Sequence, residues 1–363
     1  MLQTNLCGIK LENPILPGSG PHTGNLDKML SLANTQKLGA LVTKTIAPEA
    51  AQVPRPCIVA TNNSVMNAEL WSEYDCRRWI EDFLPNFKKQ SSTPIIASVG
   101  YKTEEMCMIM REVDPFVDGY EVNPRYASQV GDFSAVGALV AETRKITERP
   151  IWVKMNGAAF SDPIAYARAC VENGANGVIA ATAIGPNMVI DLKKRRPMIG
   201  PTYVWTSGPA IKPYALAMIY MIKNAMPDIS ILATGGVSSA QDVVEYLLAG
   251  ADAVEVLSIA MLKGKHYYSK IIEELPGALK EFGFSSVEEV KATTMVIPEA
   301  KLEPSFPKFD AVKCRKCGLC SKNCPYDALC ENAEKLPVLD KSECFGCGLC
   351  ESRCPAKAIF GML

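Results

Sequence analysis

The chain has 363 residues, of which 48% are hydrophobic and 21% charged, and its formal net charge is −1. This balance gives no reason to expect a nucleic-acid partner or a membrane-surface partner. Charges, glycines or prolines interrupt every apolar stretch before it reaches the length of a transmembrane helix. The N-terminal residues lack the basic and apolar regions of a secretory signal peptide. We therefore expect a soluble, cytoplasmic protein whose thiols are reduced.

Short apolar or β-branched segments recur along most of the chain, and segments of helical periodicity, such as 134–148 and 239–250, separate them. The eight apolar segments are 14–18, 40–44, 94–99, 117–122, 150–155, 176–181, 229–236 and 252–258. Strand followed by helix, eight times, predicts an α/β fold of the (β/α)8 or TIM-barrel type. The continuous apolar character of the segments is typical of parallel strands that are buried on both faces.

Polar residues follow these predicted strands at their carboxyl ends, where barrel enzymes carry their chemistry. The candidates are Ser19, Gly20, Lys44, Glu121, Asn123, Lys154, Gly235, Gly236 and Ser258. A glycine pair before a helix is often only a tight turn. After the seventh strand of a barrel, however, it favours a phosphate site, because the backbone approaches closely and the helix offers free N–H groups.

Lys44 and Lys154 stand at the ends of apolar strand segments. A lysine at such a place is either a solvated loop charge or the partner of an anion. Burial of an ammonium group without a partner is costly, so the surrounding apolar residues favour an anionic ligand.

Cysteines dominate the last fifty residues, in the spacing C-x2-C-x2-C-x3-C-P, which occurs twice. The first run is Cys314, Cys317, Cys320 and Cys324, and the second is Cys344, Cys347, Cys350 and Cys354. This spacing is typical of two [4Fe-4S] clusters, and the fourth cysteine of each run is expected to bind the cluster of the other run. Zinc knuckles and a disulfide framework are the less favoured alternatives.

The domain organisation follows from these patterns. We predict a barrel with closing helices over residues 1–300, a linker rich in proline over 301–310, and a small bacterial-type ferredoxin domain with two [4Fe-4S] clusters over 311–363. Because the clusters transfer single electrons and most organic oxidations transfer two, a flavin is expected between them. FMN, which has one terminal phosphate, matches the single predicted phosphate site.

Several segments resemble the FMN barrel that dihydroorotate dehydrogenases and dihydropyrimidine dehydrogenases share. These segments are 43–58, 65–71, 190–200, 207–216 and 233–256. With the cysteine runs behind the barrel, the chain is most similar to the C-terminal part, or separate barrel subunit, of dihydropyrimidine dehydrogenases. The resemblance implies FMN contacts from Ser19, Gly20, Lys44, Asn67, Asn123, Lys154, Gly208, Gly235, Gly236 and Ser258. It also implies that Asn67 and Asn123 face the substrate.

The chain departs from the family pattern after the fourth strand. Where the family has N-x-S-C-P-N or N-x-S-C-P-H, residues 123–128 read NPRYAS, so Tyr126 stands at the position of the proton-transferring thiol. We predict that Tyr126 is the catalytic acid and that Ser128 is an alternative proton relay. A phenol with a pKa near 10 donates a proton better than it accepts one, which favours reduction of a C=C bond.

Two further positions are expected to contact the substrate. Arg125 offers a bidentate partner for a carboxylate, although an exposed loop arginine is the simpler interpretation. After the sixth strand, the family's N-[ST] pair appears as Thr182-Ala183. We therefore predict substrate binding by Asn67, Asn123, Arg125 and Thr182.

These features together predict an FMN- and iron–sulfur-dependent oxidoreductase that acts on CH–CH bonds and reduces a carbonyl-activated C=C bond of a pyrimidine-like molecule. Dihydroorotate dehydrogenation in pyrimidine synthesis is one alternative, and a noncatalytic electron-transfer subunit is another. No G-x-G-x-x-G motif follows an early strand, so the electron partner is expected to be a ferredoxin or a separate NAD(P)H/FAD reductase subunit. Homo-oligomers are expected from the family analogy alone.

Overall fold

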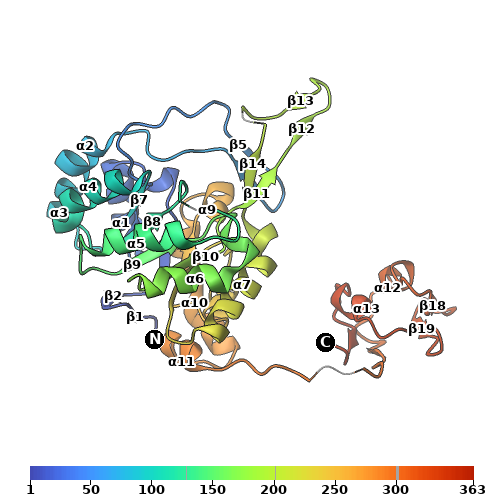
Figure 1. Ribbon diagram of the computed structural model, residues 1–363. Coiled ribbons are helices and arrows are strands. Elements are labelled where there is room, and N and C mark those ends of the chain that lie inside the picture. Colours follow the sequence, from blue (N-terminus) through green and yellow to red (C-terminus); the bar gives the residue numbers. More distant parts are fainter. Residues whose placement is uncertain (128, 201, 300–301) are drawn as a thin grey trace. The chain divides into compact units, whose positions relative to one another are not determined.

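The computed structural model describes residues 1–127, 129–200, 202–299 and 302–363 (Figure 1). These residues form two compact units, Met1–Met295 and Val296–Leu363, each of which is described by itself.

Eight parallel strands at the centre of the first unit form one sheet in the order β3-β16-β15-β10-β9-β8-β7-β4. Their bounds are β3 Ile15–Pro17, β4 Leu41–Val42, β7 Ile95–Gly100, β8 Gly119–Asn123, β9 Ile151–Lys154, β10 Gly177–Ala180, β15 Ser230–Ala233 and β16 Ala253–Val256. The first and last strands of this order, β3 and β4, also come close to each other. The N–H of Gly39, just before β4, donates to the carbonyl of Ile15 in β3 at 3.0 Å. The sheet is thus a nearly closed α/β barrel, and the predicted fold class is confirmed.

Helices surround the barrel (Figure 1). They are α1 Leu26–Gln36, α2 Cys76–Arg78, α3 Leu84–Gln90, α4 Thr103–Val113, α5 Ser134–Arg144, α6 Pro163–Glu172, α7 Lys212–Ala225, α8 Ala240–Leu248, α9 Ser258–Lys263, α10 Tyr267–Glu281 and α11 Val287–Ala292. The side chains of Asn25, Asp162, Ser239 and Ser286 accept hydrogen bonds from the first turns of α1, α6, α8 and α11. Such N-caps fix where these helices begin.

The side chains inside the barrel form one apolar layer and, nearer the carboxyl ends of the strands, one charged layer. Trp152 and Ala253 belong to a buried interior group that also contains Leu16, Val42 and Ile96. Because side chains alternate along a strand, the residues two positions after Trp152 and Ala253 point into the same interior. These residues are Lys154 and Glu255, nearer the carboxyl ends of the strands.

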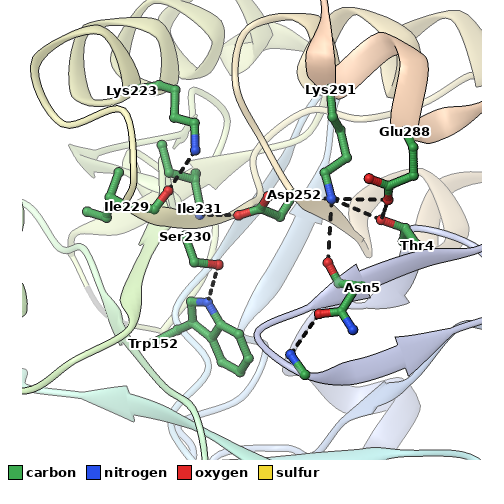
Figure 2. A network of polar contacts seen from close by, with 11 residues as sticks. Thr4, Asn5, Trp152, Lys223, Ile229, Ser230, Ile231, Asp252, Glu288 and Lys291 are labelled. Atoms are coloured by element: carbon green, nitrogen blue, oxygen red, sulfur yellow. Dashed lines mark hydrogen bonds and ion pairs between the residues drawn. The ribbon is translucent and has the colours of Figure 1, made fainter.

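The opposite end of the barrel is held by a polar network (Figure 2). Lys291 of α11 donates to the hydroxyl of Thr4 at 3.0 Å and lies 3.6 Å from the carboxylate of Asp252. The indole N–H of Trp152 donates to the hydroxyl of Ser230 at 3.0 Å. This network joins the last helix of the first unit to the first strand and to the amino ends of β15 and β16.

Short antiparallel elements that the sequence did not predict decorate the barrel. Strands β1 Thr4–Leu6 and β2 Ile9–Leu11 form a hairpin, and β12 Ile190–Asp191 and β13 Arg196–Pro197 form another. A four-stranded sheet has the order β11-β14-β6-β5, with bounds Ile184–Asn187, Val204–Ser207, Val65–Asn67 and Ile58–Ala60. In this sheet Trp205 lies opposite Asn67.

The second unit consists of two similar halves. Strands β17 Lys308–Phe309 and β20 Ile359–Phe360 pair with each other, as do β18 Leu329–Glu331 and β19 Pro337–Leu339. Helices α12 Leu319–Lys322 and α13 Leu349–Ser352 begin after Gly318 and Gly348, both of which have positive φ. β17 lies within the segment that was predicted as a linker. Among the described residues, no helix is long and apolar enough to cross a membrane.

Candidate active site and cluster sites

A cavity of about 520 Å³ opens at the carboxyl ends of the barrel strands. Its lining includes Ser19, Gly20, Lys44, Thr45, Asn67, Glu69, Asn123, Arg125, Lys154, Thr182, Trp205, Ser207, Gly235, Gly236, Glu255 and Ser258. We call it the barrel cavity. All but two of the described candidates named from the sequence for FMN, substrate or catalysis line it. The two are Gly208, which lies beside it, and Tyr126; Ser128 lies outside the described residues.

A buried charged group lies at the base of the barrel cavity. The ammonium of Lys154 lies 2.9 Å from Oε1 of Glu121, and the same oxygen accepts from the hydroxyl of Ser98 at 2.5 Å. Glu121 and Glu255 are almost fully buried. Burial alone would lower the pKa of Lys154, but Glu121 and Glu255 raise it above its ordinary value. Lys154 therefore stays positively charged beside the cavity.

Lys44 has carboxylate partners that the sequence analysis did not identify. Its ammonium pairs with Glu69 at 3.4 Å and also with Glu73. Partial burial alone would raise the pKa of Glu73, but the hydrogen bond and charge of Lys44 lower it below its ordinary value. The sequence offered one signal for this pairing, namely that Glu69 and Glu73 follow shortly after Asn67. The charge of Lys44 is thus compensated by the protein itself.

A glycine turn and two hydroxyl groups form one corner of the barrel cavity. Gly235 and Gly236 have φ of 99° and 105°, and a Cβ on Gly235 would lie 2.2 Å from the carbonyl oxygen of Ala181. Only glycine fits such a position. The hydroxyls of Ser207 and Ser258 lie 2.8 Å apart at the same corner.

The N–H groups of 235–237 make no hydrogen bond within the described part of the chain. The N–H of Ser238, by contrast, donates to the carboxylate of Asp242 at 2.7 Å. Free donors for an anion in the barrel cavity therefore include the N–H groups of the glycine turn and the hydroxyls of Ser207 and Ser258.

The segment after β8 presents Arg125 to the barrel cavity and directs Tyr126 elsewhere. The guanidinium of Arg125 lies 5.4 Å from the ring centroid of Trp205. The ring of Tyr126 packs against Trp71 and Tyr101, with centroid distances of 6.0 and 5.3 Å, and 57% of the residue is exposed. Partial burial and the neighbouring Tyr101 raise the pKa of the Tyr126 phenol. Tyr126 therefore stays protonated at neutral pH.

The second unit contains two cysteine-lined cavities. Cys314, Cys317, Cys320 and Cys354 line the first, and Cys324, Cys344, Cys347 and Cys350 line the second. Each cavity thus combines three cysteines of one run with the fourth cysteine of the other run, as expected for a pair of [4Fe-4S] clusters. Within the described residues, no three metal-binding side chains converge closely enough for a single metal ion.

Cys330 lines neither cavity. Its thiol points to the carbonyl of Val338 at 3.8 Å, across the β18–β19 pair. This placement agrees with a cysteine that has no part in cluster binding.

An α/β barrel with a cavity at the carboxyl ends of its strands, joined to a unit with two four-cysteine sites, is typical of cofactor-dependent redox enzymes. Residues 1–279 match the family described as dihydroorotate dehydrogenase, and residues 294–359 match the 4Fe-4S dicluster domain. The chain therefore belongs to the dihydroorotate dehydrogenase family of oxidoreductases, and it carries a 4Fe-4S dicluster domain.

Named relatives support this assignment. The catalytic subunit of dihydroorotate dehydrogenase B (NAD(+)) from Pyrococcus abyssi is 30% identical over 299 residues, which cover 80% of this chain and 98% of the relative. The corresponding subunit from Geotalea daltonii is 34% identical over 267 residues, covering 70% and 86%. Dihydroorotate dehydrogenase A (fumarate) from Lactobacillus helveticus is 32% identical over 302 residues, covering 79% and 96%.

Proposed function

We propose that this protein is an FMN- and iron–sulfur-dependent oxidoreductase that interconverts a CH–CH bond and a carbonyl-activated C=C bond. Its substrate is a small molecule with a carboxylate, of the dihydroorotate and orotate type. The observation that carries the substrate assignment is Arg125, whose guanidinium lines the barrel cavity.

The residues of the barrel cavity fit FMN. The free N–H groups at Gly235 and Gly236, with the hydroxyl of Ser258, would hold a terminal phosphate. Lys154 would place a positive charge beside the flavin ring, and Asn123 would offer an amide. FMN, when bound, exchanges two electrons with a substrate and single electrons with iron–sulfur clusters.

Arg125 is the cation of the barrel cavity that lacks an acidic partner among the described residues. Lys44 pairs with Glu69 and Glu73, and Lys154 pairs with Glu121. An arginine held over an aromatic ring keeps its planar donors free for bidentate binding of a carboxylate. Relatives named as dihydroorotate dehydrogenases act, by those names, on a substrate of this class.

A second candidate is the reduction of an uncharged pyrimidine-like alkene. Tyr126 favours it, because its phenol is protonated at neutral pH and so has a proton to donate but cannot accept one. The packing of this ring against Trp71 and Tyr101 gives the candidate less support than Arg125 gives to a carboxylate substrate.

We infer that electrons pass between the clusters and a separate protein, either a ferredoxin or an NAD(P)H-dependent flavoprotein subunit. The names of the relatives support a partner, because they describe catalytic subunits of an NAD(+)-linked enzyme. The eight cysteines in two crossed sets provide the route for single electrons.

The test compares substrates with and without a carboxylate in anaerobic protein. Dihydroorotate and dihydrouracil are added to the oxidised protein, orotate and uracil to the reduced protein, and the flavin absorbance is followed. Arg125→Gln is expected to lower kcat/KM for dihydroorotate and orotate by about 10- to 100-fold, the effect of losing a charge-assisted contact. It should leave the uncharged pair unchanged.

Arg195→Gln, at the exposed tip between β12 and β13, serves as the matched control. Equal losses on charged and uncharged substrates would contradict the role of Arg125. If no compound of this panel changes the flavin, the noncatalytic electron-transfer alternative takes its place.

A further inference from the structure

We propose that Glu121 and Glu255 share one proton and form a buried proton site beneath the barrel cavity, which exchanges protons with the cavity through Ser98, Thr45 and Ser19. The site itself depends on neither FMN nor a particular substrate. Only its consequence for a reduced flavin rests on the proposed function.

The first observation is the charge content of the barrel. Its eight strands contain three charged residues, Glu121, Lys154 and Glu255, all directed to the interior. On the strands next to β16, namely β3 and β15, no residue is charged. Lys44 follows β4, but its ammonium is held by Glu69 and Glu73. Two acids, both almost fully buried, therefore face one cation at the base of the cavity.

The second observation is that two carboxyl oxygens lack a donor. Oε1 of Glu121 accepts from Ser98 and Lys154, whereas Oε2 of Glu121 and Oε1 of Glu255 are buried and have no hydrogen-bond partner among the described atoms. A buried oxygen without a donor is costly. A proton held between these two carboxyls supplies the missing donor and removes the like-charge repulsion.

The electrostatics agree with this geometry. Burial raises the pKa of Glu255 well above its ordinary value, and the Glu121 carboxylate raises it further, against the opposing effect of Lys154. Oε1 of Glu121 has two donors, whereas Oε1 of Glu255 has none. The proton therefore belongs mainly to Glu255.

The third observation is a chain of hydroxyls that leads from the cavity to this pair. The hydroxyls of Ser19 and Thr45 lie 3.2 Å apart, those of Thr45 and Ser98 lie 2.9 Å apart, and Ser98 donates to Glu121. Ser19 and Thr45 line the barrel cavity. Each hydroxyl passes one proton forward and receives another, so each oxygen again carries one hydrogen, and rotation of the hydroxyls restores the starting direction of the hydrogen bonds.

The consequence concerns the charge at the base of the cavity. With one shared proton, Lys154 and the carboxyl pair are neutral together, and without it they would carry one negative charge. When this group of three side chains is neutral, the floor of the cavity tolerates an anionic ligand, including a reduced flavin with its added negative charge. The proton site therefore keeps Lys154 able to stabilise negative charge in the cavity.

The experiment is infrared spectroscopy of the purified protein with its cofactors at pH 8, where ordinary carboxyl groups are ionised. A C=O band of a protonated carboxylic acid, shifted in D₂O, is expected in the wild type and should be absent from Glu255→Gln and Glu121→Gln. Asp252→Asn is the control, because Asp252 accepts from Ile231 and pairs with Lys291 at the far end of the barrel. No band in the wild type, or one that survives both glutamine variants, would overturn the proposal.

A second variant tests the hydroxyl chain and remains informative if the glutamine variants do not fold. Thr45→Val should keep the band but slow its shift in D₂O by at least about tenfold, because valine removes the middle hydroxyl. An unchanged exchange rate would refute the relay. Since no reading requires turnover, failure of the proton site is distinguishable from failure of the proposed function.

Discussion

Replacing Lys154 with methionine removes the cation that lies 2.9 Å from the Glu121 carboxylate. At that distance, with an effective dielectric constant of about 20, the attraction is about 6 kcal/mol before the cost of desolvation. The variant can relieve the unpaired charge by binding a second proton at the carboxyl pair. Relative to an ordinary glutamate, this protonation costs about 5 kcal/mol at pH 8 and about 1 kcal/mol at pH 5.

The predicted destabilisation of Lys154→Met is therefore about 3–5 kcal/mol at pH 8 and about 1–2 kcal/mol at pH 5. The sign follows from the raised pKa of the unpaired acids in the folded variant, because such groups stabilise the folded state at low pH and destabilise it as the pH rises. Urea unfolding of flavin-free protein measures both values. Tryptophan fluorescence reports on the first unit alone, since all four tryptophans lie there.

A surface pair gives the matched control. Lys145 lies 2.6 Å from Glu142, but the two side chains are 67% and 53% exposed. Lys145→Met should therefore change the free energy of unfolding by less than about 0.5 kcal/mol. Equal losses for Lys154→Met at the two pH values, or a comparable loss for Lys145→Met, would refute the reasoning.

Three other predictions concern the clusters, the phosphate corner and a half-buried histidine, His22. Cys354→Ser should lower the iron content from about eight to about four atoms per chain, whereas Cys330→Ser should leave it unchanged; equal iron in both variants would contradict the assignment of Cys354 as a cluster ligand. Ser258→Ala should weaken FMN binding about 10-fold in a fluorescence titration, and an unchanged Kd would exclude the phosphate corner. Burial lowers the pKa of His22, which contacts Tyr268 at 3.0 Å, to about 4. The unfolded state then binds more protons than the folded state between pH 6.5 and 4. The free energy of unfolding should therefore decrease by about 1–2 kcal/mol as the pH is lowered through that window. In urea unfolding, His22→Gln should make this dependence on pH weaker.

The barrel could be predicted because each of its strands is recognisable from its own local sequence. Segments such as 94–99 and 229–236 are apolar, are bounded by turn residues and alternate with amphipathic helices. The four-stranded sheet could not be predicted, because its strands have three or four residues and their pairing joins distant segments, as when Trp205 meets Asn67. Strands that short carry too few residues to show a period.

The sequence predicted which residues line the candidate site better than it predicted which side chains pair with them. Strand ends identified Lys154 and Lys44 as residues at the cavity, since the carboxyl ends of parallel strands share one edge. That Lys44 pairs with Glu69 and Glu73 depends on a loop 25–29 residues away, whose path the sequence does not specify. In the same way, a turn after β8 decides that Arg125, and not Tyr126, lines the barrel cavity.

The central claim is that electrons from a substrate in the barrel cavity reach the clusters of the second unit. Anaerobic addition of dihydroorotate to oxidised protein, followed by absorbance and electron paramagnetic resonance, tests it most directly. The account predicts that the flavin is reduced and that the signal of reduced [4Fe-4S] clusters then appears. A flavin and clusters that accept electrons only from a chemical reductant, with dihydroorotate and every other substrate of the panel inert, would contradict it.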